Sequence, residues 1–184
     1  HGCEKRVDEG LQAVFKDLIP VPPAVEQLRR STLRNLASRQ EQTRLKAAIE
    51  LREEGRAVVT VHNTEKLKHP IVVEALIKAI DKEEVPEVLT ELLFAVSLVH
   101  DRFLADQRIY PSIHPHLTSE NEDVRCAAVS ATRHCPNREK WTPIIDMLRV
   151  KQRKRMFETL LAQVLPSTPV SIKRKLQPVL MNSL

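Results

Sequence analysis

The sequence predicts an all-α protein, and three observations support this fold class. Glycine occurs only 3 times in 184 residues, below its usual share of about 7%, which argues against folds built from many tight β-turns. Aromatic residues make up 3% of the chain, which disfavours a β-sandwich. The chain is instead dominated by Leu, Ala, Glu, Lys, Arg and Gln, which are good helix formers.

The first third of the chain contains three segments with apolar residues at helical spacing. The predicted helices cover residues 4–18, 24–37 and 40–55. Gly55 is expected to cap the third helix at its C-terminal end. Residues 57–61 have a strand-like composition, but a lone strand would have no partner, so we interpret them as a helix continuation or a buried connector.

The helical spacing becomes more regular after residue 70. Helices are expected at 71–80, 86–100, 103–117, 123–135, 138–150, 152–165 and 170–183. Pro86 suits the first position of its helix, where no backbone N–H is needed. The polar turn at 118–123 can cap the helix that follows it.

Prolines indicate an internal repeat in the second half of the chain. Pro111, Pro143 and Pro178 each have an apolar residue two positions before and two positions after, and they are spaced 32 and 35 residues apart. Proline within a helix removes a backbone donor and bends the axis. A bend that recurs at this period predicts helix pairs stacked in register.

The most specific pattern is the step Asp123-Val124-Arg125, followed closely by Ala127 and Ala128. These residues resemble the core of a HEAT repeat, in the armadillo-like helical-repeat family. The resemblance implies that Asp123 and Arg125 are structural and form contacts between adjacent repeats. It also implies that the protein is a non-catalytic scaffold or adaptor.

We therefore expect a right-handed α-solenoid of about four to five HEAT-like helix pairs. Residues 1–60 would form N-terminal helices that match the repeat weakly, and residues 61–184 would form the HEAT-like repeats. The alternative is a compact orthogonal bundle of about ten helices. Residues expected to be buried are Val124, Ala128, Ala131, Trp141 and Leu160.

Charge is unevenly distributed along the chain. Residues 149–184 contain eight basic residues and one acidic residue, a net charge of +7, whereas the rest contains 21 basic and 23 acidic residues, a net charge of −2. Such a segment is typical of nucleic-acid, acidic-partner or membrane-surface contacts and of nuclear-localisation clusters, and also of a solvated helix face. The candidate contact residues are Lys151, Arg153, Lys154, Arg155, Lys173, Arg174 and Lys175.

No sequence motif points to catalysis or to a cofactor. The P-loop, GxSxG and HExxH patterns are absent, and the three Cys and seven His lack the CxxC or helical HxxxH spacing of a zinc site. We therefore expect no enzyme activity, no metal, no cofactor and no small-molecule substrate. The sparse, odd cysteine count and the lack of an apolar run of about 18 residues predict an intracellular protein, cytoplasmic or nuclear, without a transmembrane segment.

The main functional hypothesis is a scaffold that docks a protein partner. In a stack of helix pairs, the second helices line a concave wall that can bind extended segments or another helical domain. Candidate partner-binding residues are positions on these helices that should be exposed: Glu87, Glu91, Arg125, Ser130, Arg133 and Glu158. The alternative is a nucleic-acid-binding module that uses the basic C-terminal helices within 149–175.

Overall fold

We analysed a computed structural model of the chain. The described residues are 21–57, 67, 69–99, 107–133, 135, 138–149, 172–174 and 177–178. Within these ranges every regular element is helical and no strand occurs, which confirms the all-α prediction. The predicted helices at 4–18 and 152–165, most of the segment 57–61 and most of 170–183 lie outside the described residues.

The first described helical segment combines α2, Pro23–Leu28, with the π-helical turn η1, Arg29–Leu33. Pro23 lies in the first turn, where its missing N–H costs no helical hydrogen bond. The next helix is α3, Glu41–Ala57. Gly55 lies inside α3 and is buried, so the prediction that it caps the helix was wrong. A Cβ added at Gly55 would lie 2.8 Å from the Cβ of Leu98, and this close approach is what requires glycine here.

The helices α5, Pro70–Ile80, and α6, Pro86–Val99, form the central pair, and both begin at a proline. His69 is the N-cap of α5, where its Nδ1 accepts a hydrogen bond from the backbone N of Ile71 at 3.3 Å. Burial lowers the pKa of His69. The neutral imidazole that results is the form with an Nδ1 acceptor.

The predicted helix at 103–117 is divided into three short turns in its described part. They are η3, Gln107–Ile109, then α7, Tyr110–Ile113, then η4, His114–Thr118. Pro111 and Pro115 each occupy the first turn of a new element, because neither can donate the backbone hydrogen bond that would continue the preceding one. The prediction that Pro111 bends a continuous helix was therefore wrong.

The helix α8, Glu122–Ala131, begins after the polar turn, as predicted, and ends before the expected residue 135. Asn121 is its N-cap, and its Oδ1 accepts hydrogen bonds from the backbone N of Asp123 at 2.9 Å and of Val124 at 3.2 Å. The 3-10 turn η5, Arg138–Lys140, and the helix α9, Trp141–Arg149, follow. Like Pro111, Pro143 lies in the first turn of a helix that directly follows a 3-10 turn and begins with a buried aromatic residue, Tyr110 or Trp141.

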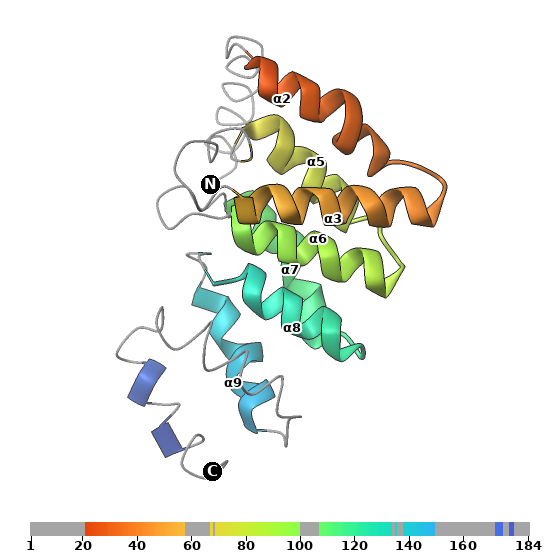
Figure 1. Ribbon diagram of the computed structural model, residues 1–184. Helices are drawn as coiled ribbons and strands as arrows, with labels where there is room; N and C mark the ends of the chain where they lie inside the picture. Colours follow the sequence, from red (N-terminus) through yellow and green to blue (C-terminus); the bar gives the residue numbers. More distant parts are fainter. Residues whose placement is uncertain are drawn as a thin grey trace, which may run out of the picture.

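The helices form two layers (Figure 1). In one layer α3, α6 and α8 lie side by side in that order, and their extensive contacts make them the best-packed helices of the described chain. In the other layer η1, α5 and α7 follow one another. Each element of the second layer also packs on the first, since η1 contacts α3, α5 contacts α6, and η4, which continues α7, contacts α8.

The hydrophobic core lies between the two layers. Val124, Ala128, Ala131 and Trp141 are buried as predicted, and Leu160 lies outside the described residues. The largest fully buried side chains are Leu51, Leu67, Leu76, Ile80, Leu92, Leu93, Ile109, Ile113, Leu117 and Ile144. In the described part of the chain, none of the helices has the length and apolar character that crossing a membrane requires.

Candidate functional site

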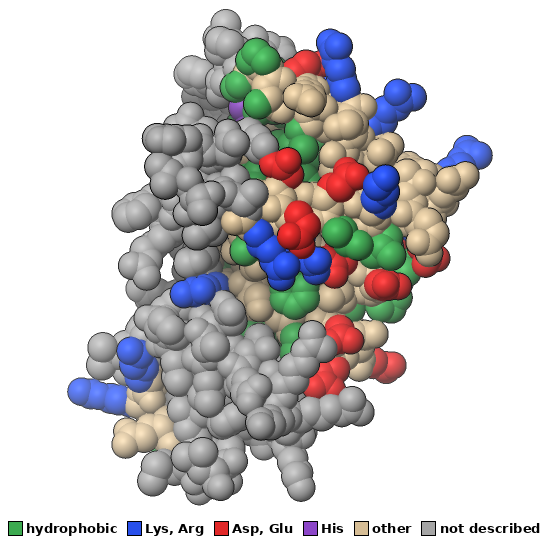
Figure 2. Space-filling model, in the orientation of Figure 1, with side chains coloured by type: hydrophobic (Ala, Val, Ile, Leu, Met, Phe, Trp, Pro, Cys, Tyr) green, Lys and Arg blue, Asp and Glu red, His purple; other side chains and the backbone are tan. Residues whose placement is uncertain are grey.

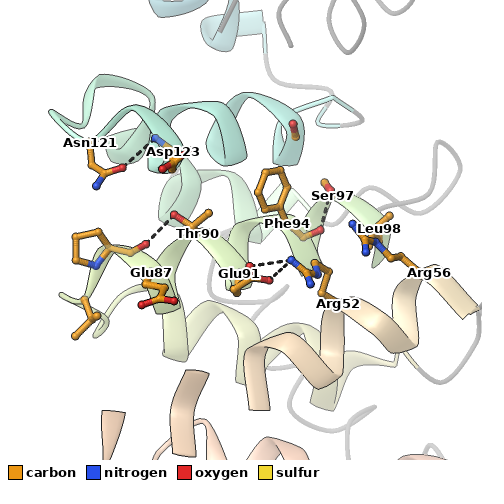
Figure 3. Close-up of a pocket in the computed structure, with 13 residues that line it drawn as sticks. Arg52, Arg56, Glu87, Thr90, Glu91, Phe94, Ser97, Leu98, Asn121 and Asp123 are labelled. Atoms are coloured by element: carbon orange, nitrogen blue, oxygen red, sulfur yellow. Dashed lines mark hydrogen bonds and ion pairs between the residues drawn. The ribbon is translucent and has the colours of Figure 1, made fainter. Parts of the chain in front are cut away.

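The face formed by α3, α6 and α8 contains a groove of about 950 Å³ (Figure 3). The α6 helix runs along the groove, while α3 and the start of α8 lie on either side of it. The lining residues are Arg52 and Arg56 from α3; Val85 from the preceding turn; Pro86, Glu87, Thr90, Glu91, Phe94, Ser97 and Leu98 from α6; and Asn121, Asp123 and Ser130 from the α8 region. The groove therefore combines charged, polar and apolar side chains.

One stripe of α6 gives the groove two chemically different ends. Glu87, Glu91, Phe94 and Leu98 recur at helical spacing of three and four residues, so they share one face of the helix. The stripe is acidic in its first half and apolar in its second. Leu98 is 36% exposed, and it is one of two large apolar side chains that are exposed in the described chain.

An ion pair crosses the groove floor from α3 to α6. Nη1 of Arg52 donates a hydrogen bond to Oε1 of Glu91 at 2.8 Å, and it lies 2.6 Å from Oε2, a contact without hydrogen-bond geometry. The two side chains are 21% and 17% exposed, so the pair is largely shielded from water. Arg52 also contacts Glu53, at 3.0 Å. These contacts fix the position of both side chains at the centre of the groove.

A second ion pair joins α3 to the turn before α6. Arg44 donates from Nε to Oε2 of Glu83 at 2.7 Å and from Nη2 to Oε1 at 3.0 Å, a bidentate arrangement. Burial by itself raises the pKa of Glu83, but the hydrogen bonds and charge of Arg44, together with the backbone N of Val85, outweigh it and hold the pKa below its usual 4.5. The hydrogen bonds with Glu83 in turn raise the pKa of Arg44.

Both ion pairs connect residues that are 39 positions apart. Because the two pairs share this offset, residues of α3 lie beside residues 39 positions later, from Glu83 in the turn before α6 to Glu91 within α6. The offset is close to the length of one helix pair in a repeat protein.

The turns before α3 and α8 share one hydrogen-bond pattern. Nη1 of Arg44 donates to the carbonyl oxygens of Ser38 at 3.1 Å and Arg39 at 3.3 Å, six and five residues earlier. Arg125 uses the same Nη1 atom on the carbonyl oxygens of Ser119 and Glu120, again six and five residues earlier. The two arginines thus close their turns in the same way.

The serines of these turns also correspond to each other. Oγ of Ser38 accepts a hydrogen bond from the backbone N of Gln40 at 3.2 Å, and Oγ of Ser119 accepts one from the backbone N of Asn121 at 3.3 Å. In the turn before α6, Oε1 of Glu83 accepts from the backbone N of Val85 at 3.0 Å, which is the same two-residue spacing. The sequence analysis judged residues 1–60 a weak match to the repeat and did not predict this correspondence. Arg44 is nevertheless followed closely by Ala47 and Ala48, as Arg125 is by Ala127 and Ala128.

The partner-binding candidates on α6 and α8 occupy different environments. Glu87 is exposed and Glu91 is paired with Arg52, and both line the groove. Ser130 is only 5% exposed and its Oγ donates to the carbonyl oxygen of Cys126 at 3.0 Å, so the expectation that it is exposed was wrong. The reason is that α8 is surrounded by neighbours and buries each of residues 126–131.

Two of the remaining partner-binding candidates, Arg125 and Arg133, do not line the groove. Arg125 is partly buried because its guanidinium group reaches back to the turn at Ser119 and Glu120. Arg133 lies beyond the last residue of α8 and is partly exposed. Glu158 lies outside the described residues.

The basic C-terminal candidates are described only in part. Lys173 and Arg174 are exposed and helical, while Lys151, Arg153, Lys154, Arg155 and Lys175 lie outside the described residues. The sequence analysis did not single out a further group of exposed basic residues in the described region. It consists of Arg29 and Arg30 in η1 and of Arg34, the residue after η1. Figure 2 shows basic side chains along this upper edge and acidic side chains at the right-hand ends of α6 and α8. The exposed acids there include Glu84, Glu87, Glu120 and Asp123.

Lys140 is the most deeply buried basic side chain in the described structure, at 5% exposure. Its Nζ donates to the carbonyl oxygens of Thr132 at 2.8 Å, Arg133 at 3.3 Å and Cys135 at 2.6 Å, so all three N–H bonds are used. Burial lowers its pKa, and the nearby Cys135 opposes this effect. Lys140 therefore caps the C-terminal end of α8 and connects it to the start of α9.

The two described cysteines are divided between helix and loop. Cys126 lies in α8 and Cys135 lies beyond its end, so the expectation of a single helix over 123–135 was wrong. Both side chains are buried and neither forms a disulfide, and burial raises the pKa of Cys135 to about 11. Among the described residues there is no group of three or more His, Cys, Asp or Glu that could hold a metal ion.

Comparison with known protein families gives no family that matches this chain. No curated protein matches its sequence significantly. The HEAT-like resemblance therefore stays a prediction from the residues themselves.

Proposed function

We propose that the chain is a non-catalytic helical-repeat scaffold, a right-handed α-solenoid of HEAT-like helix pairs. Three features support the repeat arrangement: the alternation of the helices between two layers, the 39-residue offset of the two ion pairs, and the shared turn pattern of Arg44 and Arg125. In this arrangement the described helix pairs are η1 with α3, α5 with α6, and η4 with α8.

The partner docks along the face formed by α3, α6 and α8. The observation that carries this proposal is the groove of about 950 Å³ along α6, because it leaves Leu98 exposed beside fixed charges. An exposed apolar side chain rimmed by polar groups is typical of a protein-interaction site. The face is made by three separate helices, so the scaffold holds the groove residues in fixed positions before any partner binds.

The test fills the groove with a large side chain. Thr90 lies in the groove and its hydroxyl bonds only to the carbonyl oxygen of Pro86 in its own helix, at 2.7 Å, so Thr90→Trp is expected to block the groove without disrupting the core. Lys46→Trp is the matched control, because Lys46 is exposed on α3 and does not line the groove. Each variant and the wild-type chain would be used for quantitative affinity capture from cells that produce the protein.

The proposal predicts a discrete partner that is recovered by wild type and by Lys46→Trp and is reduced at least about tenfold by Thr90→Trp, the loss expected when a hot-spot pocket is blocked. Circular dichroism and the melting temperature must be the same for all three chains. Equal recovery of every captured protein by both variants would contradict docking in this groove.

A second candidate function is nucleic-acid binding through the basic C-terminal helices. The exposure of Lys173 and Arg174 favours it, because exposed cations can neutralise phosphates. The test is a salt titration of binding to labelled duplex DNA and single-stranded RNA, with a variant in which Arg153, Lys154, Arg155, Lys173, Arg174 and Lys175 are changed to Glu. Binding that falls steeply with salt and is lost in the variant would support this function. No binding at low salt would exclude it.

A further inference from the structure

We propose that the groove on α3, α6 and α8 binds an extended peptide segment in which a Lys or Arg lies three residues from a large apolar residue. This inference rests on the proposed docking function and specifies the chemistry of the partner. It is argued from charge complementarity at one end of the groove, from the apolar surface at the other, and from the distance between them.

The acidic end of the groove lies at the start of α6 and α8. Glu87 and Asp123 are both exposed and both line the groove at this end, beside Asn121 and Thr90 (Figure 3). Within the described part of the chain Glu87 forms no ion pair, whereas Glu91 and Glu83 are each paired with an arginine. A cationic side chain of the partner therefore complements this end of the groove.

The opposite end is apolar and is flanked by arginines. Phe94 is partly buried and Leu98 is 36% exposed, and both lie on the groove side of α6 near Arg52 and Arg56 (Figure 3). Burial of a large apolar side chain against Phe94 and Leu98 supplies the hydrophobic contact. Glu91, the nearest acid of the groove, is already paired with Arg52, so a second cation finds no such partner at this end and the order of the partner's side chains is fixed along the groove.

The helical rise gives the spacing between the two contacts. Glu87 and Phe94 are seven residues apart in α6, a separation of about 10 Å along the helix axis at 1.5 Å per residue. An extended chain advances about 3.3 Å per residue, so about three residues span this distance. A basic side chain opposite Glu87 therefore places an apolar side chain three residues away opposite Phe94.

We take an extended segment rather than a helix as the occupant of the groove. An extended main chain is narrower than a helix of about 10 Å in diameter, so it can lie along α6 between the arginines of α3 and the start of α8.

The test is selection of random dodecapeptides displayed on phage against the full chain, followed by fluorescence polarisation with labelled synthetic copies of the enriched peptides. The expected result is enrichment of peptides with a Lys or Arg three residues from Leu, Ile, Met or Phe. Glu87→Lys should lower their affinity at least about fivefold, since it replaces an attraction by a repulsion. Glu84→Lys is the matched control, because Glu84 is an exposed acid of the same segment that lies outside this groove, and it should change affinity less than twofold.

The other outcomes separate this inference from the proposed function. Two results would overturn the inference and leave the docking function standing, provided that Thr90→Trp abolishes peptide binding. In the first, the enriched peptides carry an acidic residue instead of Lys or Arg three residues from the apolar residue. In the second, Glu87→Lys and Glu84→Lys change their affinity equally. A helical apolar pattern in the enriched peptides, with spacings of three and four residues, would also overturn it. Peptides that bind Thr90→Trp as tightly as wild type would overturn both proposals.

Discussion

In the layer formed by α3, α6 and α8, the junction of α3 with α6 and the junction of α6 with α8 depend on different side-chain chemistry. Between α3 and α6, the ion pairs Arg44–Glu83 and Arg52–Glu91 connect the helices, and Gly55 allows a close approach to Leu98. Between α6 and α8, the packing relies on the small side chains of α8, where each of residues 126–131 is buried and three of them are alanines. The same side-by-side packing is thus achieved once by charge pairing and once by small volume.

The register of these helices and the spacing between them therefore have separate causes. Ion pairs at a common offset of 39 residues fix which turn of α6 lies beside which turn of α3. Alanines fix only how closely α8 approaches its neighbours, since a methyl group carries no directional information. The first junction should therefore respond to charge and pH, and the second to side-chain volume.

The largest effect is expected from a charge in the second junction. Ala128 is fully buried, so Ala128→Glu places an unpaired carboxylate where no solvent reaches it. We expect a loss of at least about 4 kcal/mol in the free energy of unfolding, with local unfolding of α8. Urea denaturation followed by circular dichroism measures this loss. A variant that unfolds at the wild-type urea concentration would show that Ala128 does not lie in a packed junction.

The next effect tests the first junction. Glu83 has a side chain only 4% exposed, so Arg44→Met leaves a buried carboxylate without its cation and should cost about 3–5 kcal/mol. Arg125→Met is the matched control, because Arg125 closes its turn with the same carbonyl contacts; it should cost only about 1–2 kcal/mol. Adding Glu83→Gln to Arg44→Met should recover part of the loss. Equal losses of unfolding free energy in Arg44→Met and Arg125→Met would contradict the claim that ion pairs stabilise the first junction.

The Arg44–Glu83 pair also gives this junction its pH dependence. The folded pKa of Glu83 is lowered, so its contribution is present above the ordinary pKa of 4.5 and is lost as the pH falls through the folded value. The stability difference between wild type and Glu83→Gln should therefore shrink in acid.

A third effect is expected in alkali, on the C-terminal side of α8. The ordinary pKa of a cysteine thiol is 9.0, and burial raises the pKa of Cys135 to about 11, so between these pH values the folded state retains a proton that the unfolded state has lost. Stability should fall between these pH values by about 2–3 kcal/mol. Cys135→Ala should reduce this fall in stability. Urea titrations of the wild-type chain and of Cys135→Ala at pH 8 and pH 11 measure the difference. Parallel losses in both chains would show that the thiol is not shielded.

The smallest effect is expected at Gly55. Alanine favours a helix interior by about 1 kcal/mol over glycine, but its Cβ would lie 2.8 Å from the Cβ of Leu98, and overpacking costs about 1–3 kcal/mol. Gly55→Ala should therefore lower stability by about 1 kcal/mol, measured as a decrease in melting temperature. An increase would mean that α3 and α6 are not in close contact at this position.

The sequence predicted the second junction better than the first. Three alanines in one short segment indicate close packing from local composition alone, and Ala128 and Ala131 are buried as expected. The pairs of Arg44 and Arg52 could not be predicted, because their partners lie 39 residues away and no local spacing connects them.

For the candidate site, sequence reasoning identified acids on α6 but not the groove. Glu87 and Glu91 were predicted candidates. Phe94, Leu98 and Arg52 were not, because only the packing of α3 against α6 brings them together. Ser130 was misjudged because the sequence of one helix does not reveal that neighbouring helices leave it only 5% exposed.

The most direct test of the docking face is site-specific photo-crosslinking in cells. A benzophenone amino acid at position 90 lies in the groove, and the same group at position 46 is exposed on α3 outside it. The account predicts a discrete crosslinked partner from position 90 and none from position 46. Crosslinking of the same partner from position 46 alone, or from neither position, would contradict it.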